Sequence, residues 1–236
     1  MDSPIPLLLT IAFYLYFVIS LGPRLMKKRE PFILTGVMMV YNLAQIFFNG
    51  IFVVESLRLL WLPGKFNFMC QTVDYSNDPL ALKTAAYVWL FFITRLLDLL
   101  DTVFMVLRKK HNQVSFLHIY HHTGMALGSW IGVKYLPGGH PLFLGVVNAF
   151  VHAIMYSYYL LTSVYPTYKE SIWWKKHITE LQLMQFLVTA LHMLIGLLNF
   201  NCDYPKIIMA IIIPQDIFMF MLFWDFYKKT YYKSKT

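Results

Sequence analysis

The sequence predicts an all-α, polytopic membrane protein with seven transmembrane helices. Of its 236 residues, 58% are hydrophobic and only 14% are charged, and the apolar residues are gathered in long runs. An average soluble domain carries about 25% charged residues and about 45–50% apolar ones. The composition therefore excludes a soluble globular domain, a disordered chain and a disulfide-dense secreted domain.

Seven apolar runs are each long enough for a transmembrane helix, which needs about 20 residues. The expected spans are 4–22, 33–54, 85–107, 116–133, 142–162, 179–199 and 206–227. The connectors between them are short, except for the one near residues 55–84, whose Pro, Gly and Asn residues indicate turns. We found no internal repeat and no low-complexity segment, so we expect one transmembrane domain, residues 1–236.

The basic residues are distributed unevenly over the connectors, within a net charge of +8. Those on one side are Arg24, Lys27, Lys28, Arg29, Arg108, Lys109, Lys110, Lys169, Lys175, Lys176, Lys228, Lys229, Lys233 and Lys235. Far fewer lie on the other side, and Arg95 lies inside a span. The positive-inside rule places the basic side in the cytosol, the N-terminus in the lumen and the C-terminus in the cytosol. The charge thus indicates topology, and we expect no nucleic-acid partner.

The first run resembles a retained helix, because it lacks preceding basic residues and is followed by Lys27–Lys28–Arg29. The same topology places Cys70 and Cys202 in luminal connectors, near span ends. Two cysteines in an oxidising compartment can form a disulfide. The alternative is two unrelated thiols.

The third run contains three ionisable residues, which are candidate functional groups because each is costly in lipid. Arg95, Asp98 and Asp101 are three residues apart and so follow one helix face. A purely structural ion pair between Arg95 and Asp98 is the alternative.

The fourth run begins with His118, His121 and His122, all on one helix face. Such a cluster can bind metal, as in His-box di-iron desaturases and hydroxylases, but those enzymes use several His clusters and this chain has one. We therefore expect no metal. The other chemistry is acyl transfer: an imidazole can act as a base or as a nucleophile towards a thioester, and a water-poor site protects the acyl-imidazole from hydrolysis.

The fifth and sixth runs also carry polar residues at helical spacing. They are Asn148, His152, Tyr156 and Tyr158 in the fifth run, and Gln182 and Gln185 in the sixth. An interfacial aromatic belt and hydrogen bonds between helices are the alternative interpretations. Since these groups lie towards the cytosolic ends, we expect a polar chamber on that side and an apolar cavity towards the lumen. Candidate lining residues are Phe91, Phe92, Leu96 and Trp130.

In the seventh run, Pro214 is the only residue that interrupts a span. A seven-helix receptor or transporter is the non-enzymatic alternative for the whole chain. Paired broken helices or an internal repeat would favour a transporter, and the sequence has neither.

Four ordered motifs show a resemblance to a known family. They are Asp101–Thr102; His118-x-x-His121-His122; Asn148-x-x-x-His152-x-x-Met155-Tyr156-x-Tyr158-Tyr159; and Thr179-x-x-Gln182-x-x-Gln185-Phe186. With these motifs the chain resembles the ELO/ELOVL very-long-chain fatty acid elongases over essentially its whole length. It departs from the family pattern at Arg95 and Asp98, where the family usually has Lys and Glu.

The resemblance implies a very-long-chain 3-oxoacyl-CoA synthase of the endoplasmic reticulum, without a metal or other cofactor. Such an enzyme condenses a long-chain acyl-CoA with malonyl-CoA and releases CO2 and CoA. The family fold has seven helices, six of which enclose a narrow substrate tunnel closed at the luminal end. A homodimer and contacts with other enzymes of the elongation cycle are further expectations.

The resemblance also assigns roles to residues. His121 is the expected nucleophile, with His122 or His152 as alternatives; His118 and Asp101 would orient or deprotonate it, and Asn148 and His152 would hold the malonyl group. The expected substrate-binding residues are Arg95, Asp98, Tyr156, Tyr158, Gln182, Gln185, Arg108 and Lys175. Arg108 and Lys175 would pair with CoA phosphates; topology-setting charge is the alternative for both.

Overall fold

The computed structural model describes residues 3–232, which contain helices and no strands. Lys233 and Lys235, counted above with the basic residues, lie outside this range. The helices are α1 (Ile5–Tyr16), α2 (Gly22–Met26), α3 (Thr35–Ser56), α4 (Pro79–Leu97), α5 (Leu99–Leu107), α6 (Phe116–Tyr135), α7 (Leu142–Val164), α8 (Ile172–Leu198) and α9 (Lys206–Tyr227). Short π-helical segments join α1 to α2 and extend α3 to Trp61 and α9 to Tyr232.

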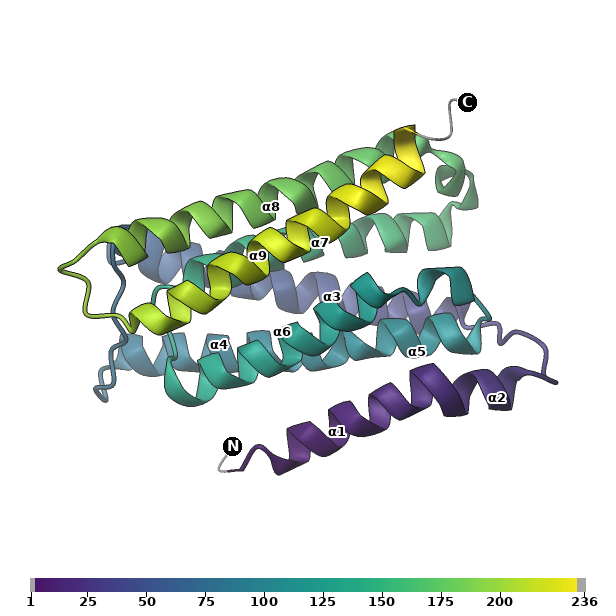
Figure 1. Cartoon of the computed structure of the whole chain (residues 1–236), viewed down its shortest axis with the longest axis horizontal. Coiled ribbons are helices and arrows are strands. Elements are labelled where there is room, and N and C mark those ends of the chain that lie inside the picture. Colours follow the sequence, from purple (N-terminus) through teal and green to yellow (C-terminus); the bar gives the residue numbers. More distant parts are fainter. Residues whose placement is uncertain (1–2, 233–236) are drawn as a thin grey trace.

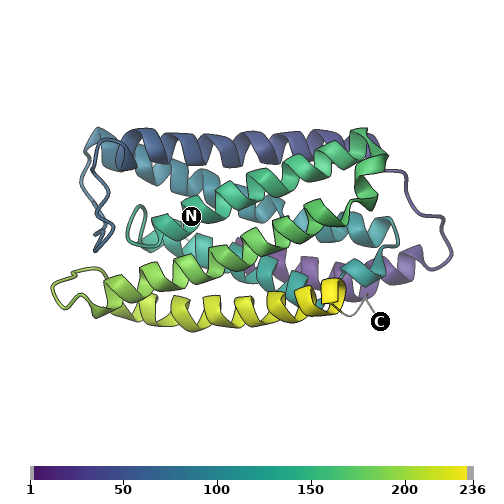
Figure 2. The same ribbon diagram turned by 90° about the horizontal axis from the view of Figure 1, so that it is seen from above.

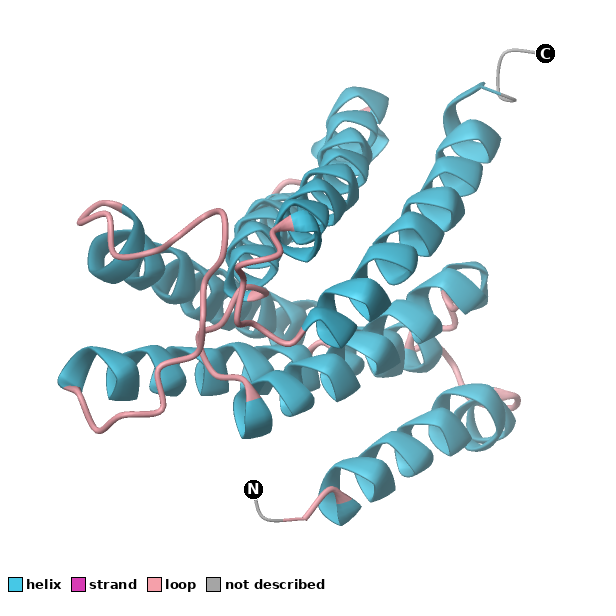
Figure 3. Cartoon of the chain, turned by 60° about the vertical axis from the view of Figure 1, so that its left-hand side comes forward, coloured by secondary structure: helices cyan, strands magenta, loops and turns pink. Residues whose placement is uncertain are grey.

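The helices form an elongated bundle (Figures 1 and 2). α3 packs along α7, α8 packs along α9, and α4 packs on α6. α1 lies at the margin of the bundle (Figure 3). We call the end with connectors 62–78, 136–141 and 199–205 the disulfide end. The opposite end, with connectors 27–34, 108–115 and 165–171, is the basic end.

All seven runs predicted from the sequence are helical. Five helical stretches are long and apolar enough to cross a membrane: Ile5–Met26, Thr35–Trp61, Leu142–Val164, Ile172–Leu198 and Lys206–Tyr232. The chain is thus a multi-pass membrane protein. α4–α5 and α6, which carry the charged residues and the His cluster, are not among these five, so seven spans stay a prediction.

The helix boundaries differ from the expected spans at several places, and at three of them the local sequence explains the difference. α4 begins at Pro79, not at 85, because the Asp78 side chain accepts a hydrogen bond from the Leu80 N–H (2.8 Å) and caps the helix. A turn at Asp98 divides the third run into α4 and α5. α8 begins at Ile172, seven residues before the expected 179. The prediction missed its first turns because they are exposed and contain charged residues, although they are helical.

Three of the four residues predicted to line the cavity pack against α1 instead. Phe92 and Trp130 pack against Leu7 and Ile11 of α1, and Leu96 packs at the same contact. These side chains lie on the faces of α4 and α6 that meet α1. They therefore bury α1 and do not line a cavity.

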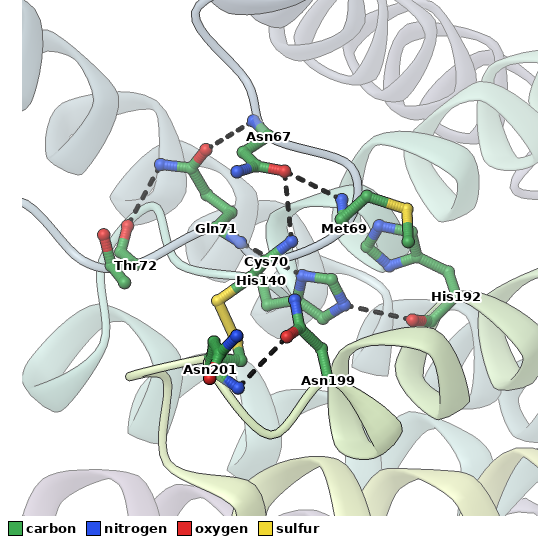
Figure 4. Close-up of a disulfide and its surroundings, with 10 residues drawn as sticks. Asn67, Met69, Cys70, Gln71, Thr72, His140, His192, Asn199 and Asn201 are labelled. Atoms are coloured by element: carbon green, nitrogen blue, oxygen red, sulfur yellow. Dashed lines mark hydrogen bonds between the residues drawn. A yellow bond between two sulfur atoms is a disulfide. The ribbon is translucent and has the colours of Figure 1, made fainter.

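At the disulfide end, Cys70 and Cys202 form the disulfide expected from the sequence (Figure 4). It joins the connector before α4 to the one between α8 and α9. The buried His140 ring lies beside it: Nδ1 accepts from the Gln71 N–H (3.3 Å), so Nε2 carries the proton and donates to the His192 carbonyl (3.0 Å). Burial lowers the pKa of His140, which keeps it in this neutral form.

We expect the double variant Cys70→Ser/Cys202→Ser to unfold more easily, by about 2–4 kcal/mol, because the bridge closes a long loop. The sequence separation of the two cysteines is 132 residues. Thermal denaturation of the purified chain in detergent measures the change. Reductant should lower the melting midpoint of the parent chain to that of the double variant, and it should leave the midpoint of the double variant unchanged. Equal midpoints for the oxidised parent and the double variant would contradict the expectation.

Candidate active site

The His cluster lies where α6 meets α7. α6 begins just after Ser115, whose side chain accepts from the His118 N–H (3.3 Å). The ring centroids are 4.1 Å apart for His118 and His122, 5.5 Å for His121 and His122, and 6.4 Å for His121 and His152. The four imidazoles that the sequence analysis singled out therefore converge on one place, with His122 and His152 buried.

A fully buried guanidinium lies next to these rings. Arg95 is 0% exposed, and its two terminal nitrogens donate to the side-chain oxygens of Asn148 and Asn49, each at 2.6 Å. Its charge is balanced by Asp98, with Nη1 and Oδ2 3.3 Å apart. A buried charge is tolerated only when paired and hydrogen-bonded. Arg95 therefore fixes the orientation of both amides, which come from α3 and α7.

Asp98 connects this pair to the His cluster. Its Oδ1 accepts from Gln45 Nε2 (2.8 Å) and from the Tyr156 hydroxyl (2.9 Å). Its Oδ2 is 3.6 Å from His152 Nδ1, which is longer than a direct hydrogen bond. A carboxylate at this position favours a proton on Nδ1 and leaves Nε2 of His152 as the basic atom.

Tyr156 lies between two carboxyl groups. Its hydroxyl is within hydrogen-bonding distance of Asp98 Oδ1 (2.9 Å) and of Asp101 Oδ2 (2.6 Å). A phenol has a single proton to donate, so one of the two contacts requires a hydrogen on a carboxyl group. Asp98, Asp101 and Tyr156 therefore share protons in one network.

The sequence analysis missed the contribution of α3. Tyr41, Gln45 and Asn49 lie on one face of this helix, and Gln45 and Asn49 are almost fully buried. Gln45 holds Asp98, Asn49 holds Arg95, and the Tyr41 hydroxyl is 3.3 Å from that of Tyr156. The signal was present: polar residues four apart in an otherwise apolar run share a helix face.

An apolar cavity of about 680 Å³ opens beside the His cluster. His121, Asn148 and Gln185 line it, as does Phe91 from the predicted apolar set. The cavity extends to Gly138 at the disulfide end. Most of its other lining residues are aliphatic or aromatic, so the space suits a long hydrocarbon chain.

Other predicted residues lie away from the cavity. The Tyr158 hydroxyl donates to the Tyr168 carbonyl (3.3 Å) at the basic end, and Gln182 Nε2 lies 3.6 Å from Met155 Sδ. Arg108 ends α5 and Lys175 is exposed in the first turn of α8, both at the basic end. None of these four lines the cavity. Within residues 3–232, no group of three or more His, Cys, Asp or Glu side chains has a metal-binding arrangement.

Comparisons with known proteins agree with the motifs. The model of the ELO family, described as the GNS1/SUR4 family, matches residues 1–236. A very long chain fatty acid elongase of Aedes aegypti is 42% identical over 235 residues, which cover 100% of this chain and 65% of that protein. Very long chain fatty acid elongase 7 of Drosophila melanogaster is 40% identical over 233 residues, covering 99% of this chain and 70% of the relative.

A human protein gives the same result. Very long chain fatty acid elongase 4 of Homo sapiens is 42% identical over 235 residues, covering 100% of this chain and 74% of the relative. These matches confirm the family predicted from the motifs and give no support to the desaturase or receptor alternatives. The chain belongs to the ELO (GNS1/SUR4) family.

Proposed function

We propose that the chain is a very-long-chain 3-oxoacyl-CoA synthase, which joins a long-chain acyl-CoA to malonyl-CoA. The names of its relatives support fatty acid elongation. The observation that carries the proposal is the position of His121: it lines the apolar cavity and belongs to a cluster of four imidazoles from two helices. A thioester carbonyl at His121 would leave its acyl chain in the cavity.

In the first step, a nitrogen of His121 attacks the thioester carbonyl carbon. The carbon–sulfur bond breaks, an acyl-imidazole forms, and the imidazole proton leaves with the CoA thiolate as free thiol. His118 and His122, whose rings lie near that of His121, would relay the proton, and Asp101 would act through the Tyr156 hydroxyl that it binds. The bound acyl chain would fill the cavity and displace water from it, which would preserve the acyl-imidazole.

In the second step, malonyl-CoA loses CO2 and the resulting enolate attacks the acyl carbonyl. The new carbon–carbon bond forms as the carbon–nitrogen bond to His121 breaks, and the ring regains a proton. Asn148 can stabilise the enolate oxygen: Arg95 occupies its Oδ1, so its Nδ2 donor is available on the cavity side. His152 Nε2 would act as a base or hydrogen-bond partner for the malonyl group.

The rest of the proposal concerns CoA and the membrane. Arg108 and Lys175 at the basic end would pair with CoA phosphates, and that end would face the cytosol. The disulfide end, with Cys70 and Cys202 oxidised, would face the lumen of the endoplasmic reticulum. The C-terminus would then be cytosolic and the N-terminus luminal. A homodimer and contacts with other elongation enzymes belong to the same proposal.

The acyl-enzyme is the direct test of this function. We expect the purified chain, given acyl-CoA alone, to release CoA and gain one acyl mass, because the first step needs no malonyl-CoA. Mass spectrometry should place the adduct on His121, and His121→Ala should lose it. The exposed His111→Ala is the matched control and should keep it. If acyl-CoA alone gives neither CoA release nor a protein adduct in the parent chain, the result would favour direct attack, with the histidines acting only as bases.

A second prediction separates the two steps with a matched pair of variants. Asn148 and Asn49 bind Arg95 in the same way, at 2.6 Å, but only Asn148 lines the cavity. Asn148→Asp replaces the Nδ2 donor by an acceptor and should slow condensation about 100-fold or more, the typical cost of an oxyanion donor. Asn49→Asp should slow condensation much less.

In both variants, single-turnover CoA release from acyl-CoA should stay within about threefold of the parent rate, since that step does not use the enolate. Rapid-quench measurement of the two half-reactions gives both values. Equal losses of condensation in the two variants would show that Asn148 acts only through Arg95.

A further inference from the structure

A carboxyl group lies in the wall of the acyl cavity, and the proposed mechanism does not use it. Asp216 of α9 is 6% exposed and lines the cavity between apolar residues of the same helix, Ile212 and Met219. Its Oδ2 accepts a hydrogen bond from the Thr189 hydroxyl of α8 (2.8 Å). Carboxyl groups inside a span are costly and are candidate functional residues.

Several other polar side chains line the same cavity, and we group three of them with Asp216 as the mid-cavity polar group. They are Thr123 of α6, Gln185 of α8 and Gln215 of α9. Within residues 3–232, the Thr123 hydroxyl oxygen is buried without a hydrogen-bond partner. Gln185, 6% exposed, has no side-chain hydrogen bond to any described residue. Polar atoms of α6 and α8 are thus left for a ligand or for water.

Asp216 lies beyond the reacting centre, towards the disulfide end, and Gln185 lies about one helical turn nearer the reacting centre. The Phe186 and Phe223 rings are each 6.3 Å from the His121 ring. Thr189 follows Phe186 by three residues, and Asp216 precedes Phe223 by seven on the antiparallel α9. At 1.5 Å per residue these offsets are about 5 Å and about 10 Å along the helices. The cavity continues past them to Gly138, so an acyl chain attached at His121 would pass Asp216.

An unsubstituted acyl chain fits this wall badly. Its methylene groups would displace water from the Asp216 carboxyl and the Gln185 amide and supply no hydrogen bond in return, which is unfavourable for buried polar groups. A hydroxyl group at the matching carbon would restore the lost bonds. Sites built to bind a substrate hydroxyl discriminate strongly against the analogue that lacks it.

We propose that this cavity selects long-chain acyl groups that carry a hydroxyl group part-way along the chain, bound by Asp216 and Gln185. The inference rests on the proposed function, because it takes the cavity to hold the acyl chain. The competing explanation is that Asp216 only ties α8 to α9 through Thr189. That explanation leaves the unpartnered Gln185 and Thr123 on the same cavity without a role.

A binding measurement tests the inference without requiring turnover. The full chain in detergent is loaded with a fluorescent fatty acid, which is displaced by fatty acids of one length that are unsubstituted or hydroxylated at successive carbons. We expect one group of adjacent mid-chain isomers to bind about tenfold more tightly than the unsubstituted acid. Asp216→Leu should abolish this preference, and Asp216→Asn, which keeps a polar side chain, should retain most of it.

Two further variants complete the design. Asp225→Leu makes the same change on the same helix where the carboxyl is 53% exposed and pairs with Lys229, and it should leave the preference unchanged. If Asp216→Leu does not fold, Gln185→Leu takes its place and should reduce the preference. Equal binding of all isomers by the parent chain would overturn the inference, as would a preference that survives both Asp216→Leu and Gln185→Leu.

Elongation assays with the matching acyl-CoA esters separate the two claims. Absence of elongation with every ester would overturn the proposed function, while the displacement series would still decide what the cavity selects. The contrary outcome, at concentrations below saturation, is that unsubstituted esters are elongated as fast as every hydroxylated ester. That result would overturn the inference and leave the proposed function standing.

Discussion

The structure depends on the compensation of one buried positive charge. Arg95 has no access to water, Asp98 balances its charge from the same helix end, and its hydrogen bonds to Asn49 and Asn148 tie α4 to α3 and α7. The same two side chains hold Asn49, Asn148 and Gln45 by hydrogen bonds. Because a buried charge is expensive once a partner is lost, the positions of these amides are tightly constrained. The positions of Asn148 and His152, which are proposed to bind the malonyl group, depend on these contacts.

Two kinds of environment meet at His121. On one side lie the imidazoles of His122 and His152 and, behind them, the Arg95–Asp98 pair. On the other side lies an apolar cavity wide enough for a hydrocarbon chain. This boundary is what acyl transfer from a thioester requires: polar groups for proton transfer at the carbonyl, and a dry space for the chain. A purely structural His cluster would not need a cavity beside it.

Much of the fold could be predicted from the sequence, because apolar runs and helical spacing are local signals. Every predicted span is helical, and the residues placed on one face of α6 do converge with His152. Hydropathy failed at helix ends, where the Asp78 cap and the exposed start of α8 decide the boundary. It also gave no indication of which face of α4 or α6 meets α1, and so Phe92 and Trp130 were assigned to the cavity wrongly.

The candidate site was predicted in part for the same reason. Motifs identify residues on α5, α6, α7 and α8, but the partner of a charge can come from any helix. Gln45 and Asn49 on α3 were missed because they belong to none of the motifs. Asp216 was missed although a carboxyl group inside an apolar run was itself a signal.

A cryo-electron microscopy structure with a non-hydrolysable acyl-CoA analogue tests the central claim most directly. The account predicts the analogue's carbonyl carbon in contact with the His121 ring, CoA at the basic end, and the hydrocarbon chain in the cavity that reaches Gly138. A chain bound outside this cavity, or a carbonyl group remote from all four imidazoles, would contradict it.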